Sequence, residues 1–270
     1  MPSRLKPLID PGKVRLTDAD ALPGNGLPKG ADADRALEEI RRRIEEFQLA
    51  LGAEERRALL VVLQGRDTSG KDGVIRKVFG DLNPMYCQVS SFKRPTPVEL
   101  RHDFLWRAHQ VVPAAGMIGI FNRSHYEDVL VVRVHELVPE KLWRKRYDHI
   151  NEFERMLVDH GVTILKFALH ISKEEQRQRL EDRLADPTKN WKFEVGDLKE
   201  RGFWDQYTAA YEDMLERTST KWAPWYLVPG DKKTARDLLI GGVVVETLEQ
   251  MAPQYPKADP EVLNYLGKIE

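Results

Sequence analysis

Residues 59–73, LLVVLQGRDTSGKDG, decide the fold of this chain. An apolar run typical of a buried strand ends in Gly-x-x-x-x-Gly-Lys, and residues 74–79, VIRKVF, follow with a pattern typical of a helix. Strand, glycine loop and helix in this order are the context that a phosphate-binding P-loop requires. The alternative is an ordinary glycine turn between a strand and a helix.

This loop would bind an anion through backbone N–H groups and one ammonium group. Gly65 and Gly70 allow a close backbone approach that a Cβ would obstruct. The loop amides and the helix N-terminus then point at the anion, with the charge of Lys71 beside it. We therefore predict that phosphate or nucleotide is bound by Gly65, Arg66, Thr68, Ser69, Gly70, Lys71, Asp72 and Gly73.

One position departs from the usual motif. A Ser or Thr that holds Mg²⁺ normally follows the lysine, and here Asp72 stands in its place. Either Asp72 caps the helix, or the metal is held differently. Asp67 inside the loop is the obvious substitute, because a carboxylate so close to phosphates would be repelled unless a cation lay between them. We predict Asp67 to be a metal ligand or the base that activates the acceptor, rather than a turn former.

Length and composition restrict the class of protein. The 270 residues are sufficient for one large α/β domain, and the net charge of −1 leaves recognition of a polyanion to a local basic surface. The single cysteine, Cys87, excludes an internal disulfide and suits a reducing compartment. With no apolar leader and no membrane-spanning stretch, we expect a cytoplasmic protein without membrane or nucleic-acid partners.

Another apolar run, residues 117–121, is followed by a further group of polar residues. P-loop enzymes carry a metal or water-positioning group at such a strand end, and Asn122 occupies that place. Glu127 and Asp128 follow at the start of a predicted helix, where acids are favoured by the helix dipole. Arg123 has two interpretations: it stabilises a phosphoryl group in transfer, or it pairs with a nearby carboxylate.

The segment at about 174–196 is predicted to be a lid. It is a polar helix and loop in which Arg179 and Arg183 are four residues apart, so both lie on one face. Small P-loop kinases use such a segment to close over phosphates and exclude water. The alternative is a surface helix with balanced charge.

Strands that alternate with helices predict a three-layer α/β fold with five parallel strands and helices on both faces. We expect an irregular N-terminal arm over 1–30, one domain over 31–252 and a tail over 253–270. Continuous helices are expected over 98–112 and 197–218. No Asn-Lys-x-Asp motif of GTPases is present, which favours a small-molecule kinase over a molecular switch.

Four motifs in order resemble the type-2 polyphosphate kinase family: GRDTSGKDG at 65–73, FNRSHYED at 121–128, WKF at 191–193 and TSTKWAPWY at 218–226. The resemblance covers about 61–251 and includes the unusual Asp72. It implies a P-loop kinase fold similar to thymidylate kinase and Mg²⁺-dependent phosphoryl transfer, with Mn²⁺ as a substitute, between inorganic polyphosphate and AMP, ADP or ATP. Asn122, His125 and Glu127 resemble the subgroup that phosphorylates both AMP and ADP.

The resemblance also implies a role for each matching residue. Lys71 and the loop amides would bind the transferred phosphate, and Asp67 would hold Mg²⁺ or orient the acceptor. Asn122 and Glu127 would lie in the phosphate and nucleotide site. Arg123, Arg179 and Arg183 would neutralise the phosphoryl oxygens. Asn122 and Asp128 are weaker metal ligands. The weaker predictions for a polyphosphate track are Lys77, Lys93 and Arg94.

Two other functions remain open. An ATP-dependent kinase of a small metabolite or nucleoside monophosphate would use the same fold, and a nucleotide-binding regulatory module would bind without turnover. The family resemblance also implies a homo-oligomer, a dimer or tetramer.

Overall fold

Five parallel strands form the central sheet of the computed structural model, which describes residues 5–269. Their order across the sheet is β2-β3-β1-β4-β5. The strands are β1 (Ala58–Gly65), β2 (Cys87–Ser91), β3 (Ile118–Asn122), β4 (Val162–His170) and β5 (Trp225–Pro229). Because β1 lies in the middle with β3 and β4 beside it, the loop that leaves β1 meets the ends of both neighbours.

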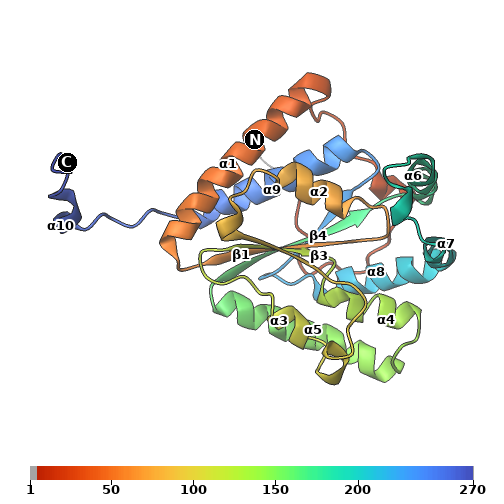
Figure 1. The fold of residues 1–270 in the computed structure, drawn as a ribbon. Coiled ribbons are helices and arrows are strands. Elements are labelled where there is room, and N and C mark those ends of the chain that lie inside the picture. The colour runs from red at the N-terminus through yellow and green to blue at the C-terminus, as the bar shows by residue number, and fades with distance from the viewer. Residues whose placement is uncertain (1–4, 270) are drawn as a thin grey trace.

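Helices cover both faces of the sheet (Figure 1). One face carries α1 (Gly30–Glu54), α2 (Lys71–Val78) and α9 (Lys233–Met251). The other carries α3 (Trp106–His109), α4 (Val131–Val134), α5 (Glu140–Asp159) and α8 (Trp204–Thr218). Two further helices, α6 (Lys173–Ala185) and α7 (Val195–Gly202), lie at the end of the sheet where β1 and β4 finish. This is the predicted P-loop kinase fold.

Alternation along β1 explains the two layers. Leu59, Val61 and Leu63 belong to the apolar cluster under α1 and α9, whereas Leu60 and Val62 belong to the cluster under α5 and α8. A strand that is buried on both faces reads as a continuous apolar run, as parallel strands do. Short 3-10 helices occupy connections: η1 (Asp18–Ala21), η2 (Pro84–Tyr86), η3 (Glu99–Arg101), η4 (His125–Asp128) and η5 (Asn190–Lys192).

Two predicted helices are wrong in extent. The segment 98–112 contains only η3 and α3, because the Asp103 side chain accepts the N–H of Leu105 at 2.9 Å and restarts the chain between them. The helix predicted over 197–218 is divided at Phe203 into α7 and α8. Gly202 ends α7, and the division lets the two helices take different directions.

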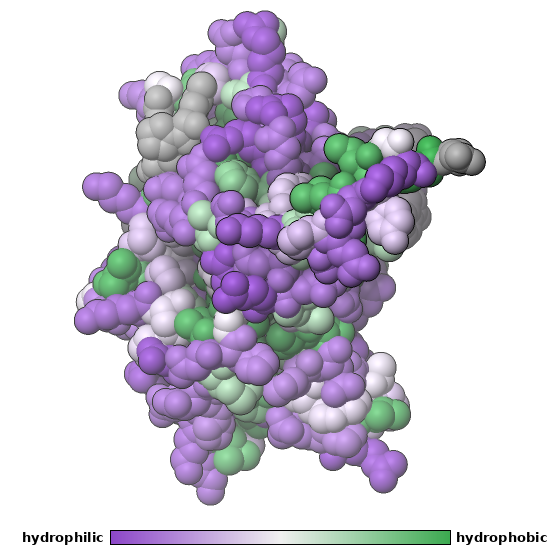
Figure 2. All heavy atoms as spheres, turned by 90° about the vertical axis from the view of Figure 1, so that its left-hand side faces the viewer, coloured by the Kyte–Doolittle hydropathy of each residue, from purple (hydrophilic) through white to green (hydrophobic). Residues whose placement is uncertain are grey.

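The two ends of the chain behave differently. The N-terminal arm packs on the body: Leu8 forms a β-bridge with Trp225, and the Thr17 carbonyl lies 2.9 Å from Nε2 of His170. The C-terminal segment with α10 (Pro260–Leu263) extends away from the body (Figure 1), and Leu266 is 86% exposed. The surface on that side is mainly hydrophilic with small separate apolar patches (Figure 2).

Over residues 5–269, none of the helices combines the length and the apolar character that crossing a membrane would require.

Candidate active site

Two glycines of the loop, Gly65 and Gly70, lie so close to Leu169 and Arg236 that no side chain would fit there. A Cβ on Gly65 would come within 2.7 Å of the Leu169 carbonyl oxygen on β4. Gly70 has φ of +96°, and a Cβ there would lie 1.9 Å from Nη1 of Arg236. Only glycine satisfies the left-handed conformation and the close approach together. The predicted reason for both glycines therefore matches the contacts in the structure.

Lys71 is folded into the loop. It is 8% exposed, and its Nζ donates hydrogen bonds to the carbonyls of Gly65 at 2.7 Å and Arg66 at 3.1 Å. Burial, followed by the charge of Arg123, lowers the pKa of Lys71 to about 8. Both hydrogen-bond acceptors of this ammonium group are neutral carbonyls, and a bound phosphate would give it an anionic partner.

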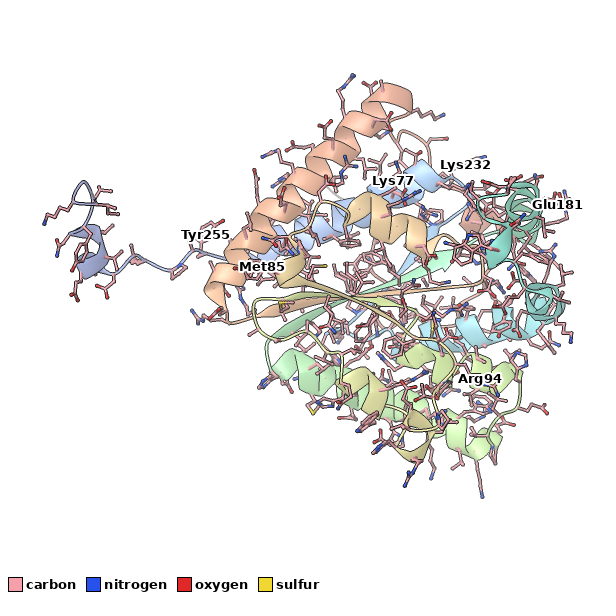
Figure 3. All side chains as sticks on the ribbon, in the orientation of Figure 1. Lys77, Met85, Arg94, Glu181, Lys232 and Tyr255 are labelled. Atoms are coloured by element: carbon pink, nitrogen blue, oxygen red, sulfur yellow. The ribbon has the colours of Figure 1, made fainter. Side chains whose placement is uncertain are left out.

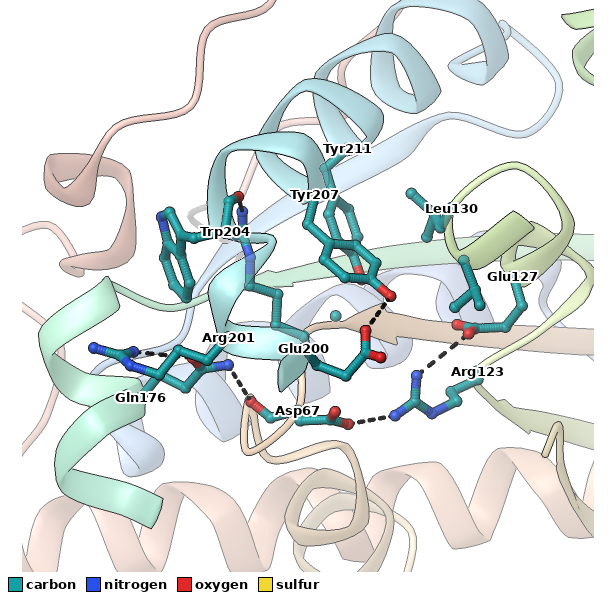
Figure 4. Close-up of a pocket in the computed structure, with 13 residues that line it drawn as sticks. Asp67, Arg123, Glu127, Leu130, Gln176, Glu200, Arg201, Trp204, Tyr207 and Tyr211 are labelled. Atoms are coloured by element: carbon teal, nitrogen blue, oxygen red, sulfur yellow. Dashed lines mark hydrogen bonds and ion pairs between the residues drawn. The ribbon is translucent and has the colours of Figure 1, made fainter. Parts of the chain in front are cut away.

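Arg123 joins two carboxylates across the carboxyl ends of β1 and β3 (Figure 4). It forms an ion pair with Asp67, and its Nη1 lies 3.3 Å from Oε2 of Glu127. Its backbone has φ of +60°, and its N–H donates to the Leu63 carbonyl at 3.0 Å. This unfavourable left-handed conformation is held by strand β1, and it places the guanidinium beside the loop.

The charge on Asp67 is retained. Burial alone would raise the pKa of Asp67, but Arg123 and Lys71 outweigh it and hold that pKa below its usual value. An ionised carboxylate beside the phosphate site fits either predicted role, metal ligand or acceptor base.

A cleft that is open to solvent lies between the loop, η4 and α8 (Figure 4). Trp204, Tyr207 and Tyr211 form an aromatic wall on α8. The Glu200 carboxylate on α7 accepts a hydrogen bond from the Tyr207 hydroxyl at 2.7 Å. Asp67, Arg123 and Glu127 lie opposite that wall. The cleft thus offers rings for a flat apolar group and charges at the loop end.

The structure corrects the orientation predicted for Arg179. Its guanidinium is buried and donates to the carbonyls of Thr68 at 2.9 Å and Gly230 at 2.6 Å. Arg236, which is 2% exposed, donates to the Ser69 carbonyl at 3.2 Å from α9. Both arginines therefore stabilise the loop from the side opposite the cleft by donating hydrogen bonds to its carbonyls. Buried carbonyls need such donors when the backbone gives them none. Arg179 does not direct its guanidinium into the cleft as its predicted role requires.

Arg66 lines the cleft with its side chain, and its part in binding phosphate or nucleotide stays a prediction. Its guanidinium lies 3.9 Å from the centre of the Trp204 ring and donates to the Thr208 hydroxyl at 2.6 Å. The guanidinium of Arg66 thus stacks on a ring of α8 and forms part of the cleft wall. The backbone carbonyl of Arg66 accepts a hydrogen bond from Lys71.

The segment predicted to be a lid, which contains α6 and η5 and is called the lid below, contacts the loop from one side. Arg183 on α6 lies 3.4 Å from Oδ2 of Asp197, and its side chain is 23% exposed. Lys192 at the tip of the lid lies 3.9 Å from Oδ2 of Asp72. Asp72 also accepts a hydrogen bond from the Asn122 amide at 2.8 Å. Asp72 therefore links the lid, the loop and the end of β3, and it makes no side-chain cap on α2.

Asp128 is wrong as a metal ligand. Its two carboxylate oxygens pair with Arg107 at 3.2 Å and Arg146 at 2.9 Å, and the side chain is largely buried. Two cations already neutralise this group, so its role is to join α3 and α5 to η4.

The remaining donors fit one divalent cation in part. Within residues 5–269 no cluster of three or more His, Cys, Asp or Glu side chains is arranged to hold a metal. Asp67 is ionised, and the hydroxyls of Thr68 and Ser69 are buried without a partner in the part of the chain that the structure describes. These are oxygen ligands, and Mg²⁺ is commonly held by one or two carboxylates with substrate phosphates as the other ligands.

The predicted polyphosphate track is not gathered into one surface. Lys77 lies on α2, on one face of the sheet, and Arg94 lies on the opposite side of the molecule (Figure 3). Lys93 and Arg94 follow β2 and are exposed. A polyanion that contacted all three side chains would have to pass around the molecule, and the track stays a prediction.

Sequence reasoning missed four side chains that shape the site. Arg236 lies in a helix read as core, where a charged Arg-Asp pair among apolar residues was the available signal. Glu200, Tyr207 and Tyr211 lie in a segment read as one amphipathic helix. The available signal was that this segment carries more aromatic residues than one buried helix face needs.

Comparison with known proteins agrees with this geometry. Residues 29–256 match the family model described as polyphosphate kinase 2. A relative from Meiothermus ruber named AMP/ADP-polyphosphate phosphotransferase is 56% identical over 224 residues, covering 83% of this chain and 84% of the relative. A relative from Rhodopseudomonas palustris named ADP-polyphosphate phosphotransferase is 46% identical over 81% of this chain and 80% of its own length.

A solved structure gives the same answer. Polyphosphate kinase 2 from Arthrobacter aurescens is 38% identical, superposes with a TM-score of 0.88, and aligns over 98% of this chain and 99% of its own. The phosphate loop, the strand-end arginine and these relatives together show that the chain belongs to the polyphosphate kinase 2 family.

Proposed function

We propose that this protein transfers the terminal phosphoryl group of inorganic polyphosphate to AMP and to ADP, giving ADP and ATP, in a Mg²⁺-dependent reaction. The names of the two relatives support this reaction, since the relative at 56% identity is named for both nucleotides. Asn122, His125 and Glu127 support the same double acceptor range by their resemblance to the AMP and ADP subgroup.

The observation that carries the proposal is the position of the cleft. It opens directly from the loop, and Asp67 and Arg123 lie at the boundary between the two. A nucleoside between Glu127 and the ring of Tyr207 would direct its phosphate to that boundary. The donor would then approach Lys71 and the loop amides from the lid side.

The residues have distinct roles in this mechanism. Phosphoryl transfer requires little covalent chemistry from the protein, so in-line positioning and charge neutralisation supply the rate. Lys71 and the loop amides bind the phosphoryl group, and Arg123 neutralises its oxygens as charge redistributes. Arg183, half-buried on α6 beside Asp197, would reach the phosphoryl oxygens when the lid closes. Arg179 and Arg236 keep the loop in shape.

Asp67, with the hydroxyls of Thr68 and Ser69, would hold the metal. Mg²⁺ neutralises phosphate charge and orients the oxygens when it is bound, and Mn²⁺ is an acceptable substitute for such oxygen ligands. Asn122 donates its amide N–H to Asp72 in this structure, which leaves its amide oxygen as the atom that would ligate the metal.

The test is incubation with AMP, Mg²⁺ and polyphosphate in the absence of ATP. The proposal predicts ADP first and ATP later. An ATP-dependent kinase would form neither product, and a binding module would bind AMP without turnover. Product only after addition of ATP would overturn the proposal. A cytoplasmic location and a homo-oligomer, dimer or tetramer, stay predictions that fractionation and light scattering would test.

A further inference from the structure

A buried ammonium group lies at a junction between the two walls of the cleft. Lys166 projects from the middle of β4 and is 0% exposed. Its Nζ donates to Oε2 of Glu154 at 2.6 Å, to the Tyr126 hydroxyl at 2.8 Å and to the Thr218 carbonyl at 2.7 Å. All three protons of the ammonium are therefore engaged, each by a different element.

The first wall is attached through Tyr126. This residue lies in η4 between Arg123 and Glu127, and its side chain is 0% exposed. Its hydroxyl accepts from Lys166 and donates to Oε1 of Glu154 at 2.7 Å. Arg123 and Glu127 flank Tyr126 in the same short segment, and both line the cleft. A backbone shift that moved Tyr126 would therefore also move the Arg123 and Glu127 side chains.

The second wall is attached through Thr218. This residue ends α8, the helix that carries Tyr207 and Tyr211, and its carbonyl is one of the three acceptors of Lys166. Its hydroxyl also accepts from the indole N–H of Trp225 at 2.9 Å. The end of α8 is therefore fixed to β4 and β5 at the same point as η4.

Stability alone does not account for this arrangement. A buried ion pair has a desolvation cost that its own attraction only balances, and well-packed apolar residues of similar volume are often as stable. Two aromatic rings lie beside Lys166 and would pack against an apolar replacement: those of Tyr126 and Trp225, whose centres are 4.8 Å apart in an edge-to-face arrangement. What apolar packing cannot supply is three directional bonds that fix the separation of two walls.

We propose that Lys166, Glu154 and the Tyr126 hydroxyl are positioning residues that hold the Arg123–Glu127 turn and α8 at the separation that phosphoryl transfer requires. The inference rests on the proposed function of the cleft. It assigns these residues no contact with substrate.

The first test removes one oxygen atom. In Tyr126→Phe the ring remains, and the hydrogen bonds of the hydroxyl to Lys166 and Glu154 are lost. Because misplacement of about 1 Å can cost on the order of 100-fold, we expect kcat for polyphosphate-dependent AMP phosphorylation to fall by about 10- to 100-fold, with KM for AMP changed less than about threefold. The matched control is Tyr147→Phe on α5, whose hydroxyl is equally buried and lies outside this network.

Equal kcat values in Tyr126→Phe and Tyr147→Phe would overturn the proposal. So would a fall in kcat that disappears when both variants are assayed well below their Tm, since that is the result of a structural role only. Coupling supplies a second readout: in an Arg123→Lys background, Tyr126→Phe should cost less than it does in the wild type, because both act on one geometry. Full additivity would contradict the assignment.

A double variant keeps the proposal testable if a single substitution prevents folding. Lys166→Met alone would leave Glu154 as an unpaired buried charge, whereas Lys166→Met with Glu154→Leu removes both charges. We expect the double variant to fold, to bind AMP by calorimetry and to show the same kcat defect as Tyr126→Phe. Wild-type turnover in the folded double variant would contradict the proposal. Absence of polyphosphate-dependent activity in the wild type would instead refute the proposed function, and the two failures are thereby distinguishable.

Discussion

The two sides of the glycine loop both carry arginines, and they use them differently. Behind the loop, Arg179 and Arg236 are 8% and 2% exposed and donate to its carbonyls. On the cleft side, the Arg123 side chain is 32% exposed and pairs with Asp67 and Glu127. Proximity to a phosphate loop therefore does not identify a phosphate ligand. The partner of each guanidinium decides whether it acts on the substrate or on the loop.

The largest effect should come from the loop itself. Lys71→Ala and Asp67→Asn should each lower kcat by about 100-fold or more, because the positioned charges that act on the phosphoryl group are removed. Circular dichroism and thermal melting should show an intact fold. The control is Lys145→Ala, an exposed lysine on α5. Turnover within a few fold of the wild type in either loop variant would refute the assigned roles.

The next prediction tests the comparison directly. Arg123→Gln should lower kcat by about 100-fold with little change in Tm, because a partly exposed donor to the transferred group is lost. Arg179→Gln should lower the free energy of unfolding by about 2–4 kcal/mol, since hydrogen bonds to several buried carbonyls are lost together. Urea unfolding and initial rates, measured on both variants, check this. The reverse pattern would show that the rear arginine is the substrate ligand.

How much of this could be read from the sequence depends on range. Local patterns predicted the loop, the five strands and α5, because an apolar run or a helical stripe encodes its own burial. Two carbonyl acceptors of Arg179 belong to Thr68 and Gly230, which are 111 and 51 residues away along the chain, and no local pattern encodes them. The break at Phe203 was missed for the opposite reason: apolar periodicity continued across it.

The catalytic roles that the resemblance assigned to five residues stay predictions. Arg123 pairs with Asp67 and lies near Lys71 at the glycine loop, and Arg183 lies on α6 beside Asp197. Arg179 instead donates to the loop carbonyls. Asp128 was misplaced because Arg107 and Arg146, remote in sequence, neutralise it.

A smaller effect is expected at the aromatic wall. Tyr207→Ala should raise KM for AMP by about 5- to 30-fold while KM for polyphosphate stays unchanged, because loss of an aromatic ring beside a base costs on the order of 1–2 kcal/mol. Tyr255→Ala, on the exposed C-terminal segment, is the control. A rise in KM for polyphosphate alone would place the donor, and not the nucleotide, against α8.

The smallest predicted effect is a pH dependence on the loop side. Since the pKa of Lys71 is lowered to about 8, its ammonium loses its proton above that pH, and the affinity for an anion falls as pH rises. Between pH 7 and 8.5 the Kd of tripolyphosphate, measured by calorimetry, should rise about fourfold. Lys71→Arg keeps its charge over this range and should flatten the profile. An unchanged slope in Lys71→Arg would assign the titration to another group.

The most direct test of the comparison is a crystal structure of the protein with AMP and Mg²⁺. The account predicts the nucleoside in the cleft between Glu127 and Tyr207, with its phosphate facing Asp67 and Arg123, and with Arg179 still bonded to the loop carbonyls. AMP bound behind the loop, against a rearranged Arg179 and with the cleft empty, would contradict it.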